Sequence, residues 1–177
     1  MAISSQAKAE RDAARLLRQC QVEAPPVLVE DLAEALEVAV ERRPGSPDIS
    51  GLLYRDDGRV VIGVNADDSP VRQRFTIAHE LGHLRLHKGE SLHVDRELRV
   101  NLRAPSIQGR GGEEREANWF AAALLMPERM VRSVAKARAD TARLSEEGLV
   151  RALAEDFEVS RQAMGYRLVN LGLLTGV

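Results

Sequence analysis

All four histidines of this chain lie between residues 79 and 93, and two of them belong to the segment HELGH at residues 79–83. Residues four apart lie on one face of a helix, where the imidazoles of His79 and His83 can reach a single ion. Glu80 would then lie beside the same ion. The segment therefore constrains the fold first, because it requires a helix that meets a second element able to complete a metal site.

Helical periodicity, capping residues and turn signals predict the other elements. Ser69 and Pro70 are typical of a helix start, and Asp57-Gly58 between two apolar segments indicates a tight hairpin turn. In chain order, the prediction gives helices over residues 5–20 and 29–37, strands over 38–43, 50–55 and 59–64, a helix over 70–87, a flexible connection over 88–112, and helices over 113–125, 128–138, 145–156 and 160–171. This order predicts an α+β fold, mostly helical, with a small antiparallel sheet packed on the HELGH helix and with closing C-terminal helices.

A length of 177 residues is typical of one compact domain. We expect an N-terminal helix within residues 1–26, a core over 27–137 and a helical pair over 138–177. The net charge of −2 gives no general attraction to nucleic acid or anionic lipid. The longest apolar run, residues 119–126, is far shorter than the ~20 residues of a membrane span. Together with a single cysteine, Cys20, and no signal-peptide pattern, these features predict a cytoplasmic protein without a membrane or nucleic-acid partner.

Two histidines supply half of a tetrahedral metal site, so a third protein ligand is expected, with the fourth position left for water. One known pattern needs glycine and histidine three and six residues after His83, but leucine and glycine occupy those positions. Another pattern takes a glutamate from a later helix. Glu113, Glu114 and Glu116 begin such a helix about 30 residues downstream, so the third ligand is expected among them.

Two longer segments, one of which contains the HELGH pattern, have distinctive sequences. Residues 65–87 read NADDSPVRQRFTIAHELGHLRLH, and residues 114–127 read EREANWFAAALLMP. Both resemble the ImmA/IrrE family of metallo-endopeptidases, and residues 153–173, LAEDFEVSRQAMGYRLVNLGL, are similar to the closing helices of that family. The resemblance covers residues 27–173 and implies a gluzincin-like metallopeptidase domain whose catalytic core lies within residues 27–137.

The resemblance also implies a site. In it His79, His83 and Glu114 bind the metal, and Glu80 is the catalytic general base that takes a proton from water and delivers it to the leaving amine. One Zn²⁺ per chain is the expected cofactor, with Mn²⁺ or Fe²⁺ as less favoured alternatives.

Among the three glutamates, Glu114 is preferred because Asn118 stands one helical turn beyond it. Asn118 resembles the residue that, in sites of this kind, accepts the other ring N–H of a ligand histidine. Glu116 and Glu113 are the weaker candidates for the third ligand.

The residue that stabilises the oxyanion is left unassigned. His87, His93 and Tyr54 carry suitable donors. His87 fits better as a helix-terminal histidine, His93 as a surface residue of the 88–112 connection, and Tyr54 as a packing residue of its strand. For the substrate, the sequence predicts an extended peptide added to an exposed edge of the strand at 59–64.

The resemblance implies a protein substrate, a helix-turn-helix (Xre-type) repressor whose cleavage relieves transcriptional repression. Two alternatives stay open. The segment LAEDFEVSRQAM resembles a helix-turn-helix, as in a DNA-binding regulator, although residues 142–177 hold four basic and five acidic residues and so lack a basic footprint. The chain could also bind a repressor without cutting it, with a metal site that is structural or otherwise non-proteolytic.

Overall fold

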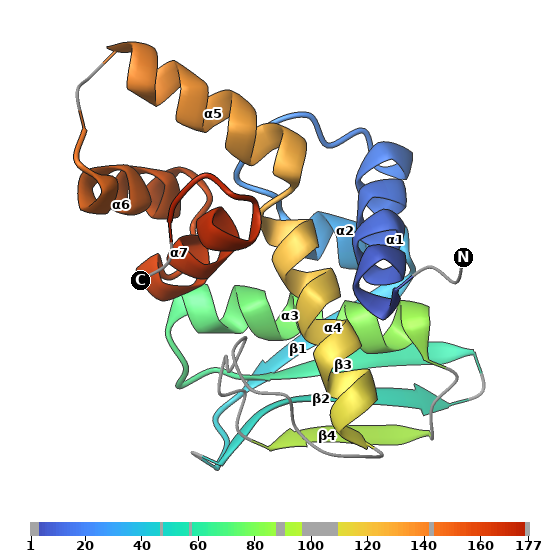
Figure 1. The fold of residues 1–177 in the computed structure, drawn as a ribbon. Helices are drawn as coiled ribbons and strands as arrows, with labels where there is room; N and C mark the ends of the chain where they lie inside the picture. The colour runs from blue at the N-terminus through green and yellow to red at the C-terminus, as the bar shows by residue number, and fades with distance from the viewer. Residues whose placement is uncertain are drawn as a thin grey trace.

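The computed structural model describes residues 4–46, 48–56, 58–87, 91–96, 110–141 and 144–175. Within these residues the elements are α1 (Ser5–Gln19), α2 (Val29–Ala35), β1 (Val38–Arg43), β2 (Ile49–Asp56), β3 (Arg59–Asn65), α3 (Pro70–Leu86), β4 (Leu92–Arg96), α4 (Arg110–Leu125), α5 (Glu128–Thr141), α6 (Glu146–Asp156) and α7 (Arg161–Asn170). The helices lie on one side of a small sheet, with α3 against the sheet and α4 crossing α3 (Figure 1). This arrangement confirms the predicted α+β class.

Helix starts follow local capping chemistry. The hydroxyl oxygens of Ser4, Ser69 and Ser160 accept hydrogen bonds from amides in the first turns of α1, α3 and α7. Each bond satisfies a donor that a helix start otherwise leaves without a partner. The helices predicted at these serines are confirmed, whereas α4 begins at Arg110, earlier than the predicted residue 113.

The sheet has the strand order β1-β3-β2-β4. β2 and β3 form the predicted antiparallel hairpin, with Gly58 at φ 86° in its turn and Asp57 outside the described residues. β1 pairs with β3 in parallel, so the sheet is mixed and the expectation of an antiparallel sheet is wrong. The apolar β3 takes the middle, where both of its edges are paired, and the charged end of β1, residues 41–43, lies at the border of the sheet.

The same strand order overturns the predicted substrate edge. β3 is paired to β1 along one side and to β2 along the other, so the strand at residues 59–64 offers no edge to an added peptide. Among the strands that the structure describes, β1 and β4 are the two with a single neighbour.

β4 lies in the stretch that the sequence predicts as a flexible connection. It pairs antiparallel to β2, with His93 opposite Leu53. Because side chains alternate along a strand, His93 shares the helix-covered face with the buried Leu53, while Leu92 and Val94 are exposed on the other face. A strand this short gives a weak periodic signal. The remainder of the predicted connection, residues 88–90 and 97–109, lies outside the described residues.

Two glycines allow close packing around α3. A Cβ at Gly51 of β2 would lie 2.3 Å from Cγ2 of Thr76, and a Cβ at Gly82 would lie 3.1 Å from Cα of Ala117 on α4. The backbones of the sheet and of α4 therefore approach α3 closely. Residues 75–83 of α3 are buried as a result, including the polar side chains of the HELGH segment.

The terminal helices brace this centre. Asp12 of α1 forms an ion pair with Arg85 of α3. Arg167 of α7 donates from Nε to the carbonyl of Met126 at 2.9 Å, and its Nη1 lies 3.0 Å from Oε1 of Glu10 on α1. One buried arginine thus connects the first helix, the last helix and the end of α4.

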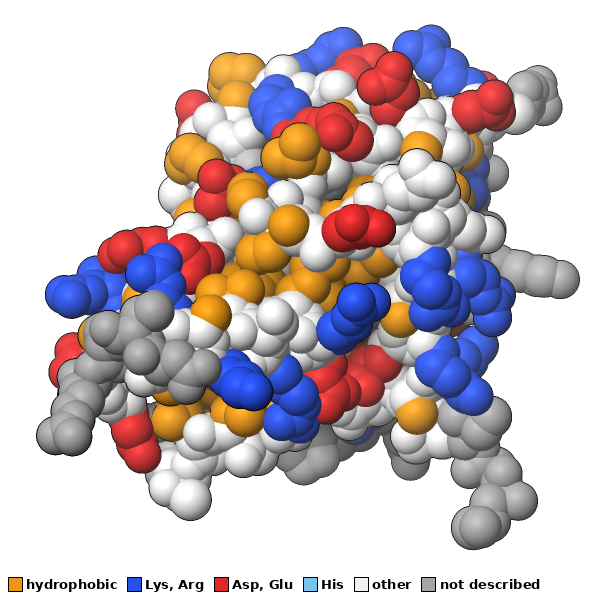
Figure 2. Space-filling view, turned by 90° about the horizontal axis from the view of Figure 1, so that it is seen from above, with side chains coloured by type: hydrophobic (Ala, Val, Ile, Leu, Met, Phe, Trp, Pro, Cys, Tyr) orange, Lys and Arg blue, Asp and Glu red, His pale blue; other side chains and the backbone are white. Residues whose placement is uncertain are grey.

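The surface carries charges of both signs. On the face seen from above, basic and acidic side chains are interspersed around a central hydrophobic area (Figure 2). None of the helices that the structure describes combines the length and the apolar character that crossing a membrane requires.

Candidate metal centre

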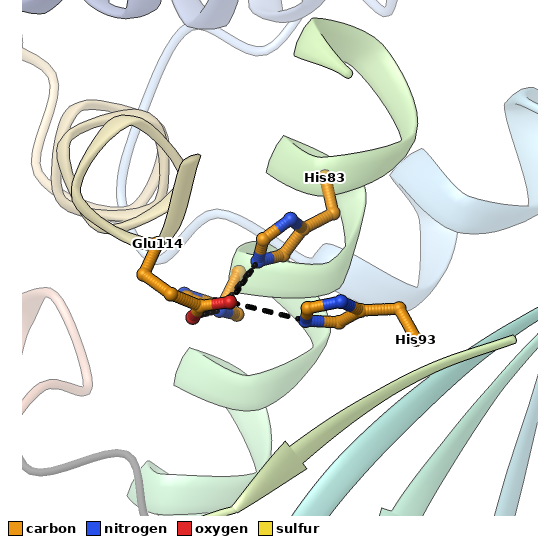
Figure 3. Close-up of side chains that lie close together, drawn as sticks. His83, His93 and Glu114 are labelled. Atoms are coloured by element: carbon orange, nitrogen blue, oxygen red, sulfur yellow. Dashed lines mark hydrogen bonds and ion pairs between the residues drawn. The ribbon is translucent and has the colours of Figure 1, made fainter. Parts of the chain in front are cut away.

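Four side chains from three elements converge beside the sheet. α3 supplies His79 and His83, α4 supplies Glu114 and β4 supplies His93, and one donor atom of each lies within 4.8 Å of the others. The Nε2 atoms of His79 and His83 are 3.0 Å apart. Glu114 places Oε2 3.2 Å from the first of these atoms and Oε1 3.4 Å from the second. In Figure 3 the carboxylate of Glu114 faces both His83 and His93, and dashed lines join it to each ring.

The surface position expected for His93 is wrong. Its side chain is 26% exposed, its Nε2 lies 3.3 Å from Oε1 of Glu114, and its ring centroid is 4.0 Å from that of His83. A signal for this position exists in the sequence. A histidine between Leu92 and Val94 has an apolar neighbour on either side, a pattern that indicates a strand with the histidine on the opposite face.

Asn118 fixes which nitrogen of His79 faces the cluster. Its Oδ1 lies 3.0 Å from Nδ1 of His79, and because an amide oxygen can only accept, Nδ1 donates the proton. In the neutral ring Nε2 then holds the lone pair, which faces Oε2 of Glu114 at 3.2 Å. Two electron-rich atoms at this distance repel each other unless a cation lies between them. The donor arrangement therefore fits a bound metal ion.

The surroundings keep the donors in their metal-binding forms. Burial lowers the pKa of His83 to about 4, against the opposing effect of Glu114, so this ring is neutral at pH 7. Burial by itself would raise the pKa of Glu114, but the imidazoles of His79, His83 and His93 that face the carboxylate outweigh it and hold the pKa well below its ordinary value. Neutral imidazole and ionised carboxylate are the forms that ligate a divalent cation.

On the side of its ring away from the cluster, His83 contacts His87, which in turn contacts Glu116. Its Nδ1 lies 3.1 Å from Nδ1 of His87, and Nε2 of His87 lies 3.3 Å from Oε2 of Glu116. With Nε2 of His83 facing the cluster, its Nδ1 donates to His87, which in turn donates to Glu116. His87 is the C-cap of α3, the helix-terminal position expected for it. Of the three candidate glutamates, Glu114 reaches the histidine pair, Glu116 bonds to His87, and Glu113 is exposed.

A family comparison agrees with this geometry. The model of the IrrE N-terminal-like domain, Peptidase_M78, matches residues 33–169. The chain belongs to this family. The match confirms the resemblance to the ImmA/IrrE family, and it includes all four residues of the cluster.

Other comparisons place the Peptidase_M78 domain among known proteins. A solved structure of a Mycobacterium tuberculosis transcriptional regulator matches it with a TM-score of 0.60 and 19% sequence identity, over 91% of this chain and 46% of the regulator. The chain therefore spans about half the length of that protein, and at this identity the likeness shows a shared fold. A search of curated proteins gives no significant match.

The sequence of this Peptidase_M78 domain also draws attention to Glu80 and Tyr54, which lie in different environments. Glu80, the expected general base, is fully buried on α3, and its Oε1 would lie 3.3 Å from a Cβ at Gly51, so the glycine leaves room for the carboxylate. Tyr54 alternates to the exposed face of β2, where its hydroxyl donates to Oδ2 of Asp56 at 3.0 Å. Tyr54 therefore lies away from the metal centre.

Proposed function

We propose that this protein is a zinc-dependent endopeptidase. The proposal is carried by the convergence of His79, His83 and Glu114 on one point, with electron-rich donor atoms turned inward, in a chain of the Peptidase_M78 family. Two imidazoles and a carboxylate form a donor set of catalytic zinc sites. One zinc ion per chain is favoured over manganese or iron.

A bound zinc ion would lower the pKa of water and polarise the carbonyl group that is attacked. In the proposal, Glu80 accepts the proton of the attacking water and returns it to the leaving amine. Asn118 orients the ring of His79, and His87 orients that of His83. Both Nε2 atoms thereby stay turned toward the ion.

We infer that the substrate is a helix-turn-helix repressor of the Xre type, whose cleavage relieves transcriptional repression. The inference extends the ImmA/IrrE resemblance of the sequence. A solved structure with the same fold is itself named a transcriptional regulator, which is consistent with a regulatory setting.

A second candidate function is a protein that binds a repressor without cutting it. His93 favours this candidate, because four protein donors are typical of structural zinc sites, whereas catalytic sites keep one position open. A DNA-binding role has less support, since acidic residues outnumber basic ones in residues 142–177 and Figure 2 shows charges of both signs mixed on the face it presents.

The substitution Glu80→Gln separates cleavage from binding. The amide has nearly the shape of the carboxylate but cannot take up the proton, so the variant is expected to keep zinc and lose catalysis. Zinc-loaded wild type and variant would each be incubated with a native lysate of host cells, and new protein N-termini identified by mass spectrometry. We expect a new N-terminus within a helix-turn-helix protein for the wild type alone.

Elemental analysis provides the control. Wild type and Glu80→Gln should each hold about one zinc per chain, while His79→Ala and Glu114→Ala should hold none. If wild type and Glu80→Gln held equal zinc and no new protein N-terminus were specific to the wild type, the proposed endopeptidase activity would be contradicted. That result would support the protein that binds a repressor without cutting it. Zinc retained by both alanine variants would contradict the metal centre itself.

A further inference from the structure

The proposed endopeptidase mechanism gives His93 no role, although the pairing of β4 with β2 fixes its position. Its register opposite the buried Leu53 directs the imidazole toward α3. The flanking Leu92 and Val94 are 49% and 37% exposed on the other face of the sheet. Pairing with β2 therefore presents the histidine, alone among these three side chains, to the metal centre.

The Nε2 atom of His93 is in an unusual state for a buried nitrogen. It is shielded from solvent and, among the described residues, makes no hydrogen bond of acceptable geometry, although Oε1 of Glu114 lies 3.3 Å away. A buried polar atom without a hydrogen bond is costly and calls for an explanation. Coordination to a cation that Glu114 also binds would account for it.

The spacing of the donors agrees with coordination. In a tetrahedral zinc site with ligand distances of about 2.0–2.1 Å, neighbouring donors are about 3.3–3.4 Å apart. The separations here are 3.0 Å between the Nε2 atoms of His79 and His83, and 3.2, 3.4 and 3.3 Å from Glu114 to His79, His83 and His93. His93 thus lies 3.3 Å from Oε1 of Glu114, the same oxygen that lies 3.4 Å from His83.

We propose that His93 is a fourth protein ligand of the resting metal centre, through Nε2, and that it must leave for a substrate carbonyl to enter. Four protein donors fill a tetrahedral site, whereas catalytic zinc keeps one position open. The second half of the proposal rests on the proposed function. Within the described residues β4 is hydrogen-bonded to β2 alone, so its withdrawal would break one ladder of backbone hydrogen bonds and leave the rest of the sheet intact.

A cobalt-substituted protein tests the ligation directly, because the spectrum of Co²⁺ reports its ligands. In the variant His93→Cys a thiolate would replace the imidazole, and we expect a sulfur-to-cobalt charge-transfer band in the near ultraviolet. The matched control is Val94→Cys, with the thiol on the same strand but on the opposite face, where no such band is expected. Absence of the band in His93→Cys with one cobalt bound would overturn the proposal.

A second measurement compares the cobalt form of the wild type with that of His93→Ala. Azide binds an open position on Co²⁺ and changes its visible spectrum, so a filled site should give no change at azide concentrations that do alter the spectrum of His93→Ala. The same alanine variant is expected to bind Co²⁺ at least ~10-fold more weakly in competition with a chelator, since loss even of an outer partner costs about 10–100-fold. An azide response of the wild type equal to that of His93→Ala would overturn the proposal.

These outcomes separate the ligand assignment from the proposed function. A charge-transfer band in His93→Cys, together with no proteolysis by the zinc-loaded wild type, would support the ligation and reject the endopeptidase. Proteolysis by the zinc-loaded wild type, together with an azide response in its cobalt form, would support the endopeptidase and reject ligation by His93. Failure of the wild type to bind Co²⁺ would overturn both.

Discussion

Asn118 contacts His79 through one hydrogen bond of 3.0 Å, and that bond decides which ring nitrogen keeps its lone pair. The bond joins α4 to α3. It would act on a bound metal only through His79, because a ring that rotates or changes tautomer no longer presents Nε2 to the cluster. Metal affinity should therefore depend on an amide outside the donor set.

We predict that Asn118→Ala lowers zinc affinity by about 10–100-fold while the protein stays folded. The measurement is a competition titration with a chromophoric chelator, with circular dichroism as the check on folding. Glu113→Ala is the matched control, since Glu113 is exposed in the first turn of the same helix. An affinity of Asn118→Ala equal to that of the control would show that the hydrogen bond does not orient the ligand.

Individual site residues can be predicted from the sequence where their geometry is local. His79 and His83 are related by one helical turn, so their spacing alone indicates a shared ligand face. The choice among the glutamates at the start of α4 depends on how α4 rotates against α3, and it required the family resemblance. The place of His93 depends on the pairing of β4 with β2, a contact between distant segments that the apolar neighbours Leu92 and Val94 indicate only weakly.

Helices α3 and α4 cross at Gly82, within the HELGH segment. A Cβ there would lie 3.1 Å from Cα and 3.2 Å from the carbonyl oxygen of Ala117, and 3.2 Å from Cδ1 of Phe120. Two of these three atoms belong to the backbone, which cannot move aside as the end of a side chain can. The separation of the two helices that carry the donors is therefore set at this glycine.

We predict that Gly82→Ala lowers the free energy of unfolding of the metal-free protein by about 1–3 kcal/mol, because overpacking forces the helices apart. Urea unfolding measures it, as a shift in midpoint at constant slope. The matched control is Gly165→Ala within α7, where a Cβ meets nothing within 4 Å, and where alanine should stabilise the helix by up to about 1 kcal/mol. If Gly165→Ala lowered the free energy of unfolding as much as Gly82→Ala does, the packing explanation would be wrong.

At the scale of elements, helices could be predicted better than the sheet. Ser69 and Ser160 cap helices through contacts three residues away, so the sequence nearby contains the information. The order of the strands is different, because the insertion of β3 between β1 and β2 depends on pairing between segments that are not neighbours in the chain. The sequence does not predict β4 for the same reason, since pairing with β2 stabilises a strand that its short pattern only weakly indicates.

Arg167, whose side chain is 6% exposed, connects helices from both ends of the described chain. Its hydrogen bonds to Met126 and Glu10 link the first and last helices of the described chain to the end of α4. α1 precedes the region matched by the family model, which begins at residue 33, and it is nevertheless integrated into the core.

We predict that Arg167→Met lowers the free energy of unfolding by about 2–3 kcal/mol, the range expected when hydrogen bonds that involve a charged group are lost. Methionine retains apolar contacts, so the loss reports the polar ones. Arg43→Ala is the control: its side chain is 81% exposed and its pair with Glu41 lies at the surface, where ion pairs contribute little. Similar midpoints for the two variants would show that Arg167 does not hold the terminal helices.

The donors of the metal centre also have an order in time, because the ribosome completes α3 before β4 and β4 before α4. An ion that meets the chain early finds only two imidazoles four residues apart. Glu114 becomes available last and reaches them only once α4 has folded across α3, so tight uptake of a metal ion at this site would follow closure of the core. A chain that holds a metal ion at all of these donors would therefore be one whose synthesis has passed residue 114 and whose helices α3 and α4 have already docked.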